Sequence, residues 1–226
     1  MTLDEAHRNV QAFKQGSLAN RIARLESLLA GKGKTTMSAL YSTHRISSTL
    51  LESALALKLA ASQINEVVHA VGILLLLPYI LNDGEKVQML SLAAGNTGKP
   101  FDLETDSRVA EFKFIDWKGG PESIRQNQLF KDFYLLAEFP TSKKRYLYVV
   151  GDEYPIRFLN GGRALQSVMS RNMKLFSDFR QKYGTRYSTV REYYCHRQGD
   201  VILADLAKCV PHFGLAVAAG EEDDDI

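Results

Sequence analysis

Three residues near the middle of the chain, Asp102, Glu111 and Lys113, are of types that can act together on a phosphate. They lie in residues 101–117, where apolar and polar residues alternate in the manner of β-strands. A hairpin that turns at Asp106 and Ser107 would place Asp102 directly opposite Glu111, with Lys113 on the same face of the sheet. The other face would be apolar and would pack into a core formed by Phe101, Leu103, Ala110, Phe112 and Phe114.

Two adjacent carboxylates repel each other unless a cation lies between them or one of them is protonated. Their oxygen atoms suit a hard divalent cation, so we expect Mg²⁺, or Mn²⁺ in its place. Such an ion makes a bound water more acidic and neutralises charge on a phosphate, while the Lys113 ammonium can stabilise an anionic transition state. The predicted chemistry is hydrolysis of a phosphodiester. The plainer alternative is an ion-pair ladder on a protein surface.

The element before the hairpin is predicted to be a helix of residues 46 to about 66, because leucines recur at every fourth position. Its buried face would be formed by Leu51, Leu55 and Leu59. The apolar run that follows, residues 67–81, is interrupted by His69, Gly72 and Pro78 and is too short to span a bilayer. We expect that run to be buried core, as a helix end or a strand, and we expect no membrane segment.

The elements after this run complete the predicted order. Residues 86–93 are expected to form a strand beside the hairpin, and residues 145–151 a further strand. A helix is expected between the hairpin and the last strand, because turn residues precede a stretch with an apolar face. The turn residues are Gly119, Gly120 and Pro121, and the apolar face carries Ile124, Leu129, Phe133 and Leu136. The order helix, three strands, helix, strand indicates an α/β fold with a mixed sheet.

Asp102 followed by Glu111-Phe112-Lys113 resembles the D…(D/E)xK signature of the PD-(D/E)XK nuclease superfamily. The predicted elements also resemble that superfamily's restriction-endonuclease-like αβββαβ core, so the resemblance covers residues 46–151. It implies metal ligation by Asp102, Glu111 and the backbone carbonyl of Phe112, and a role for Lys113 in positioning the attacking water. The sequence departs from the signature in one respect, because Pro100 lies two places before Asp102 and not beside it.

The resemblance implies two further contributions to the site. Many members of the superfamily carry a glutamate on the helix before the sheet, and Glu52 is the only acid between Ile46 and Asn65. Some members carry a glutamine on the helix after the motif strand, and Gln126 and Gln128 fit this position equally. We therefore expect Glu52 as an additional metal ligand and one of the two glutamines at the site.

The regions that flank the core are expected to be helical. Residues 1–45 would form an N-terminal extension, in which residues 3–30 make one long amphipathic helix. Its apolar stripe could pack on its own domain, or could form a homodimer or a contact with a partner subunit. That stripe consists of Leu18, Ile22, Leu25 and Leu29. Residues 152–220 would add C-terminal helices to the same domain, at about residues 162–182 and 188–207.

The charge distribution is uneven, although the formal net charge is only +2. Residues 221–226 form an acidic tail with five negative charges, so the rest of the chain carries +7, and the tail is expected to be disordered. Residues 143–200 hold twelve Lys and Arg against five acids, an excess that suits a nucleic-acid backbone and equally suits solvated helix faces. The expected nucleic-acid contacts are Lys143, Lys144, Arg145, Arg163 and Arg171.

Tyrosines interleave with the arginines of this basic region. They could stack on the bases of a single strand, or they could be ordinary core and rim residues of a helix. The tyrosines concerned are Tyr183, Tyr187, Tyr193 and Tyr194. The pattern alone leaves both interpretations open.

The sequence as a whole predicts a metal-dependent nuclease, with DNA favoured over RNA because DNA is the superfamily's more common substrate. By analogy, the protein would act in phage defence, restriction or mobile-element biology. Two cysteines, Cys195 and Cys209, are too few for a disulfide framework and favour a reducing, cytoplasmic location. Two alternatives remain: a catalytically silent or partner-dependent nuclease-fold subunit, and an interaction module whose acidic tail docks a basic partner.

Overall fold

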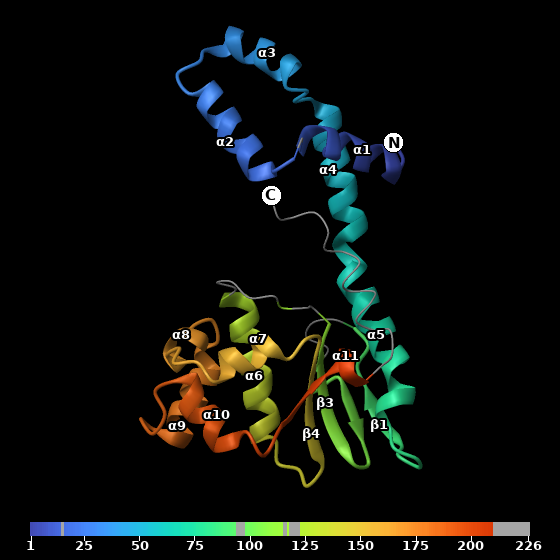
Figure 1. The fold of residues 1–226 in the computed structure, drawn as a ribbon, viewed down its shortest axis with the longest axis vertical. Helices are drawn as coiled ribbons and strands as arrows, with labels where there is room; N and C mark the ends of the chain where they lie inside the picture. Colours follow the sequence, from blue (N-terminus) through green and yellow to red (C-terminus); the bar gives the residue numbers. More distant parts are fainter. Residues whose placement is uncertain (15, 94–97, 115–116, 118–122, 210–226) are drawn as a thin grey trace. The chain divides into compact units, whose positions relative to one another are not determined.

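The structure, a computed structural model, describes residues 1–14, 16–93, 98–114, 117 and 123–209. It divides into two compact units, Met1–Asn65 and Glu66–Ile226, which are described separately (Figure 1). Two predicted features lie outside the described residues. These are the acidic tail and the turn before the second core helix, with Gly119, Gly120 and Pro121.

The first unit is built from helices. They are α1 (Leu3–Lys14), α2 (Leu18–Leu29), α3 (Lys34–Thr43) and α4 (Ser48–Ala60), followed by the 3₁₀ turn Ala61–Gln63. The prediction of one helix over residues 3–30 is wrong, because the chain breaks between α1 and α2. Gly16 adopts a φ of 92°, and the Ser17 hydroxyl caps α2 by accepting a hydrogen bond from the Asn20 N–H.

The leucine face that was predicted to be buried on α4 is exposed. Leu51, Leu55 and Leu59 show 62%, 54% and 76% of their surface. The contact of α4 with α1 is made elsewhere, where the buried Ser53 accepts a hydrogen bond of 2.9 Å from the Asn9 side chain. The spacing of the leucines therefore identified an apolar face of α4, but the packing of α1 determines which face of α4 is buried.

The second unit contains the predicted order of helix, three strands, helix and strand. These elements are α5 (Ile64–Ile80), β1 (Val87–Leu90), β2 (Leu103–Thr105), β3 (Arg108–Lys113), α6 (Ser123–Glu138) and β4 (Lys144–Val149). The helix predicted over residues 46 to about 66 is present as α4, but the helix that precedes the sheet in this unit is α5. The apolar run that was expected to be a helix end or a strand forms most of this helix.

The sheet has five strands in the order β1-β2-β3-β4-β5. Strand β2 runs antiparallel to both β1 and β3, whereas β4 runs parallel to β3, and β5 (Ile202–Asp205) runs parallel to β4. The fold is therefore mixed α/β, as predicted. The helix predicted over residues 188–207 is wrong at its end, because α10 (Val190–Arg197) stops before β5. A short apolar run such as Ile202–Asp205 does not distinguish a strand from a helix by its period.

Helices cover both faces of the sheet (Figure 1). The inner side of α5 contributes Ile73, Leu76 and Ile80 to a core with Leu103, Ala110, Phe112 and Tyr148. On the other face, α6 packs on Val109, Leu147 and Val149. Beyond α6 lie the shorter helices α7 (Glu153–Leu159), α8 (Leu165–Val168), α9 (Met173–Tyr183) and α10, while α11 (Leu206–Cys209) follows β5.

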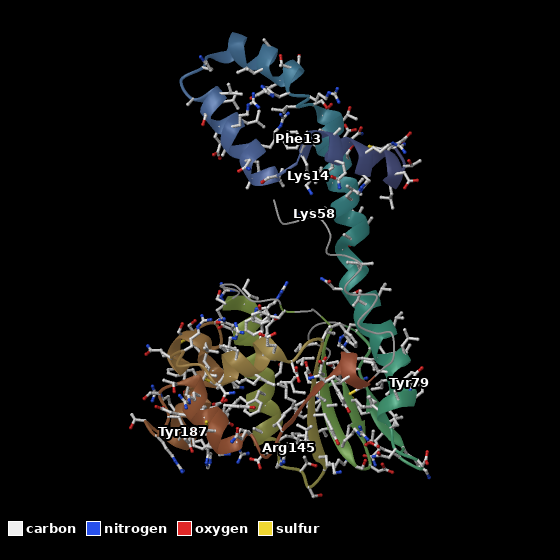
Figure 2. All side chains as sticks on the ribbon, viewed as in Figure 1. Phe13, Lys14, Lys58, Tyr79, Arg145 and Tyr187 are labelled. Atoms are coloured by element: carbon white, nitrogen blue, oxygen red, sulfur yellow. The ribbon has the colours of Figure 1, made fainter. Side chains whose placement is uncertain are left out.

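The tyrosines of the C-terminal helices belong to this second core. Tyr187 and Tyr193 are buried, and the hydroxyls of Tyr183 and Tyr193 each donate a 2.6 Å hydrogen bond to the carboxylate of Glu138 at the end of α6. Lys182 and Arg197 pair with the same carboxylate. Tyr187 lies among the side chains of these helices in Figure 2. Of the two interpretations of this tyrosine cluster, packing accounts for Tyr187 and Tyr193.

Candidate functional site

The hairpin that carries the candidate residues has the predicted turn. Leu103 pairs with Ala110 and Glu104 pairs with Val109, which is the register expected for a turn at Asp106 and Ser107. This register brings the residues that follow Ala110 on β3 alongside the chain that precedes Leu103.

The regular alternation ends before Asp102, however. The Asp102 N–H donates to the Ala110 carbonyl at 3.1 Å, although Leu103 is the strand partner of Ala110. The prediction that Phe101 lies on the same face as Leu103 is wrong, since Phe101 packs in the core beneath α6. A slip of one residue exchanges the two faces of a strand, which accounts for this difference.

Asp102 is held from two sides. Its Oδ2 accepts a 3.0 Å hydrogen bond from the backbone N–H of Phe112, and its Oδ1 lies 3.3 Å from Nε2 of His69. His69 comes from α5, and its ring meets the ring of Phe114 edge to face at 5.8 Å. The buried Asp102 carboxylate therefore faces the C-terminal end of β3 on one side and the helix before the sheet on the other.

Close packing fixes the position of α5 at His69. Gly72 lies one turn after His69, and a Cβ atom at this glycine would come within 2.5 Å of the Phe114 ring. The missing side chain lets Phe114 approach the helix backbone. Phe114 in turn lies in a row of stacked rings along this face of the sheet, with Phe112 and Tyr148.

Lys113 joins the hairpin to α6. Its Nζ lies 2.8 Å from Glu111 Oε1 and 2.8 Å from Asp132 Oδ2. Glu111 and Lys113 alternate with Ala110 and Phe112, so they point away from α5 and toward α6. The prediction that Glu111 and Lys113 share a face is confirmed. Asp102 was predicted to lie on that face as well, but its carboxylate lies against His69 of α5. Asp132 was not predicted.

Burial and charge shift the ionisation of the motif residues. The pKa of Glu111 is raised to about 7, mainly by burial; Lys113 acts to lower it, and the charges of Asp132 and Asp102 act to raise it. Burial by itself would lower the pKa of Lys113, but Asp132 and Glu111 raise it above its usual value. Two carboxylates, Glu111 and Asp132, therefore share one ammonium group, and with both ionised the cluster has an excess of negative charge.

The excess of negative charge favours binding of a divalent cation, although few side chains that could act as ligands lie close together. Across the described ranges of the chain, no group of three or more His, Cys, Asp and Glu side chains is arranged to hold a metal ion. Mg²⁺ does not require such a cage, because it usually keeps several waters and binds one or two carboxylates. The groups that could hold it are Asp102, Glu111 and the Phe112 carbonyl.

Glu52 does not belong to the unit that carries the motif. It lies on α4 in the first unit, where it lines a pocket together with Glu5, Arg8 and Asn9. In the second unit, the helix before the sheet presents His69 to Asp102. The resemblance implied a glutamate on this helix, whereas the residue that lies beside the motif is a histidine, His69.

The two predicted glutamines lie near the start of α6. Gln126 accepts a hydrogen bond from the guanidinium of Arg163, and Gln128 is exposed. Neither is the α6 residue that contacts Lys113, because that residue is Asp132, one turn after Gln128. The sequence did indicate that Asp132 has a partner. It stands on the apolar face of the predicted helix, between Leu129 and Phe133, where a charged residue is rare unless it is paired.

The predicted basic contacts fall at different ends of the sheet. Arg163 donates a hydrogen bond to Gln126 near the start of α6. Lys144 lies beside Arg108 in the register of β3 and β4, at the opposite end of β3 from Lys113. Five residues of strand separate these ends, which corresponds to roughly 16 Å.

Lys143 and Arg145 have partners of their own near Lys144. Lys143 binds Glu104 at 2.7 Å, and the Arg145 guanidinium donates to the backbone carbonyls of Phe139 and Thr141. Arg171 is exposed between α8 and α9. Of the five predicted contacts, Arg163 is the one that contacts α6, the helix that also supplies Asp132 to Lys113.

Comparison of the chain with models of protein families, with curated proteins and with solved structures found no match.

Proposed function

We propose that the second unit is a metal-dependent nuclease of the PD-(D/E)XK type that hydrolyses phosphodiester bonds. The observation that carries the proposal is the half-buried cluster in which Lys113 lies between Glu111 and Asp132, with the Asp102 charge close enough to act on Glu111. The order of α5, β1 to β3, α6 and β4 supports it, because the superfamily's core has the same succession of elements. This cluster is better explained by chemistry than by stability, since burying charged groups usually costs more than their pairing returns.

The proposed cation is Mg²⁺ or Mn²⁺, held by Asp102, Glu111 and the Phe112 carbonyl. When bound, it would supply positive charge for the phosphate oxygens and increase the acidity of the attacking water. Glu111 must be ionised to act as a ligand, and a pKa of about 7 means that it loses its proton near neutral pH. The hydrogen bond from the Phe112 N–H fixes the direction of one Asp102 oxygen.

The chain's own groups have distinct parts in the proposed reaction. Lys113 presents a fixed ammonium to the attacking water and to the charge that develops on the phosphate. Asp132 is a positioning residue, because its carboxylate keeps that ammonium charged and limits its rotation. His69 is a positioning residue for Asp102.

The proposed substrate is a nucleic acid, with DNA favoured by the resemblance. Arg163 and Gln126 form a polar pair at the start of α6, where a phosphate neighbouring the scissile one could be bound. The proposed setting in phage defence, restriction or mobile-element biology rests on analogy alone.

A second candidate is a nuclease-fold subunit that is silent by itself or active only with a partner. The observation in its favour is that Lys113 is already engaged by two carboxylates, and that His69 occupies one side of Asp102. In such a protein, a partner would have to rearrange these contacts before a phosphate could enter.

Cleavage of plasmid, linear duplex, single-stranded DNA and RNA with Mg²⁺ or Mn²⁺ distinguishes these candidates. Native protein should cut at least one substrate, EDTA should stop it, and Glu111→Gln should abolish it. The matched control is Glu104→Gln, since Glu104 also pairs with a lysine on this sheet, at 2.7 Å from Lys143. Binding without cutting would favour the silent subunit. Neither binding nor cutting would favour an interaction module.

A further inference from the structure

Helix α5 is apolar on all sides. No Asp, Glu, Lys or Arg occurs between Glu66 and Asp83. One side is used by the sheet, where Ile73 and Leu76 are fully buried. The opposite side is exposed along the length of the helix, and we call it the outer face of α5: Val67, Val68, Val71, Leu74, Leu75 and Tyr79. In Figure 2, Tyr79 points away from the sheet.

The outer face is larger than the scattered apolar residues of an ordinary surface. Its side chains are between 46% and 60% exposed. An aromatic side chain covers roughly 150 to 250 Å², and valine and leucine lie near or below the lower figure, so six side chains about half exposed leave on the order of 500 Å² of apolar surface. The largest patch on a monomeric protein is about 300 to 600 Å² and is often functional. A helix that is apolar all round is normally enclosed on all sides.

We infer that the outer face of α5 is the interface of a symmetric homodimer, in which a second copy of this chain packs α5 against α5. A two-fold interface joins identical surfaces, so a face without charges is complementary to itself. Two such faces would bury about 1,000 Å², which reaches the lower limit for specific association. The predicted dimer contact on α2 is a weaker candidate, because Leu25 is buried and only Leu18 and Ile22 of that stripe are well exposed.

A lipid bilayer suits this face less well than a second copy does. By length and composition the helical stretch Ser48–Ile80 could cross a membrane, and only 18% of its apolar part is buried; the mostly buried core helices of soluble proteins pass the same test. Within the second unit, however, α5 lies against the sheet along one side, so lipid could not surround it. Helices that lie in the membrane surface carry Lys and Arg along their flanks, and none occurs between Lys58 and Lys86.

The dimer would place its seam directly behind the candidate site. His69 and Gly72 lie on the inner side of α5, against Asp102 and Phe114, while Val71 lies on the outer face. The inference does not depend on the proposed function, because association can be measured whether or not the protein cuts a nucleic acid.

Sedimentation velocity of the full chain, from about 0.5 to 100 μM, tests the inference. The native protein should sediment as a species of twice 25.3 kDa at the upper concentrations. Val71→Asp and Leu74→Lys should each weaken association by at least about tenfold, because each buries an unpaired charge in the seam. Gln181→Asp, an exposed change on α9, should leave association unchanged. Circular dichroism of each variant would confirm that it is folded.

A cross-linking experiment locates the seam. Val71→Cys, in a chain with Cys195→Ser and Cys209→Ser, should form a covalent dimer with a short bismaleimide, while the same reagent on Gln181→Cys should not. A native protein that stays monomeric at 100 μM would overturn the inference. So would a dimer that survives both Val71→Asp and Leu74→Lys. Co-sedimentation of the native protein, but not of these variants, with phosphatidylcholine vesicles in place of dimer formation would also overturn it.

Discussion

The charge of Asp132 controls how firmly Lys113 is held. The substitution Asp132→Asn keeps the size of the side chain and an acceptor oxygen, but removes the negative charge that lies 2.8 Å from Lys113 Nζ. Two unit charges near a protein surface interact by roughly 4 kcal/mol at 4 Å, before the loss of their hydration is subtracted. Because the Lys113 side chain is 32% exposed, water screens the pair, and we expect a net loss of about 1 to 2 kcal/mol.

If Lys113 acts on the transition state, this loss should appear in kcat. We expect kcat to fall about five- to thirtyfold in Asp132→Asn, while KM changes less than about twofold. Asp132→Glu should recover part of the rate, because a carboxylate is again within reach of Lys113. Single-turnover cleavage of a labelled duplex with Mn²⁺ gives both constants, and urea unfolding of each variant separates a change in rate from a change in stability.

Two results would refute this reasoning. The first is a folded Asp132→Asn protein with the native kcat, which would mean that Asp132 only stabilises the fold. The second is an equal loss of rate in Glu104→Gln, which removes a carboxylate from a comparable pair at the other end of the sheet.

Three further predictions concern packing, acid stability and metal binding. Gly72→Ala should destabilise the protein by about 1 to 3 kcal/mol in urea unfolding, because the new methyl group would overlap the Phe114 ring; an unchanged midpoint would show that the ring moves freely. Glu85, paired with Arg108, has its pKa lowered from 4.5 to about 2, so its contribution of roughly 3 kcal/mol should be complete above pH 4.5 and lost as the pH falls to 2. Unfolding of Glu85→Gln should lack that part of the pH dependence, and equal slopes would contradict the assignment. The affinity for Mn²⁺, measured by titration calorimetry, should fall as the pH drops below about 7, because Glu111 must lose a proton to bind; a flat profile between pH 8 and 6 would argue against Glu111 as a ligand.

The hairpin and the order of the elements could be predicted because local patterns determine them. A turn at Asp106 and Ser107 sets the pairing of Leu103 with Ala110, and the alternation on β3 places Glu111 and Lys113 on one face. The slip at Asp102 could not be predicted, since an irregular residue at a strand end changes faces without changing the pattern.

The contacts between elements were less predictable. Which side of α4 is buried depends on where α1 packs, and the period of Leu51, Leu55 and Leu59 carries no information about that. Asp132 and His69 each had a visible signal, as polar residues within apolar stretches, but their partners lie on other elements and follow from tertiary packing.

The measurement that tests the nuclease proposal most directly is the rate of plasmid nicking in Mn²⁺ by native protein, Lys113→Met and Lys143→Met. Both substitutions remove a lysine that pairs with a glutamate of the same sheet, and only the first lies in the proposed site. The account predicts nicking by the native protein and by Lys143→Met, and a loss of at least about a hundredfold in Lys113→Met. Equal nicking by all three proteins, or none by the native protein under any metal condition, would contradict it.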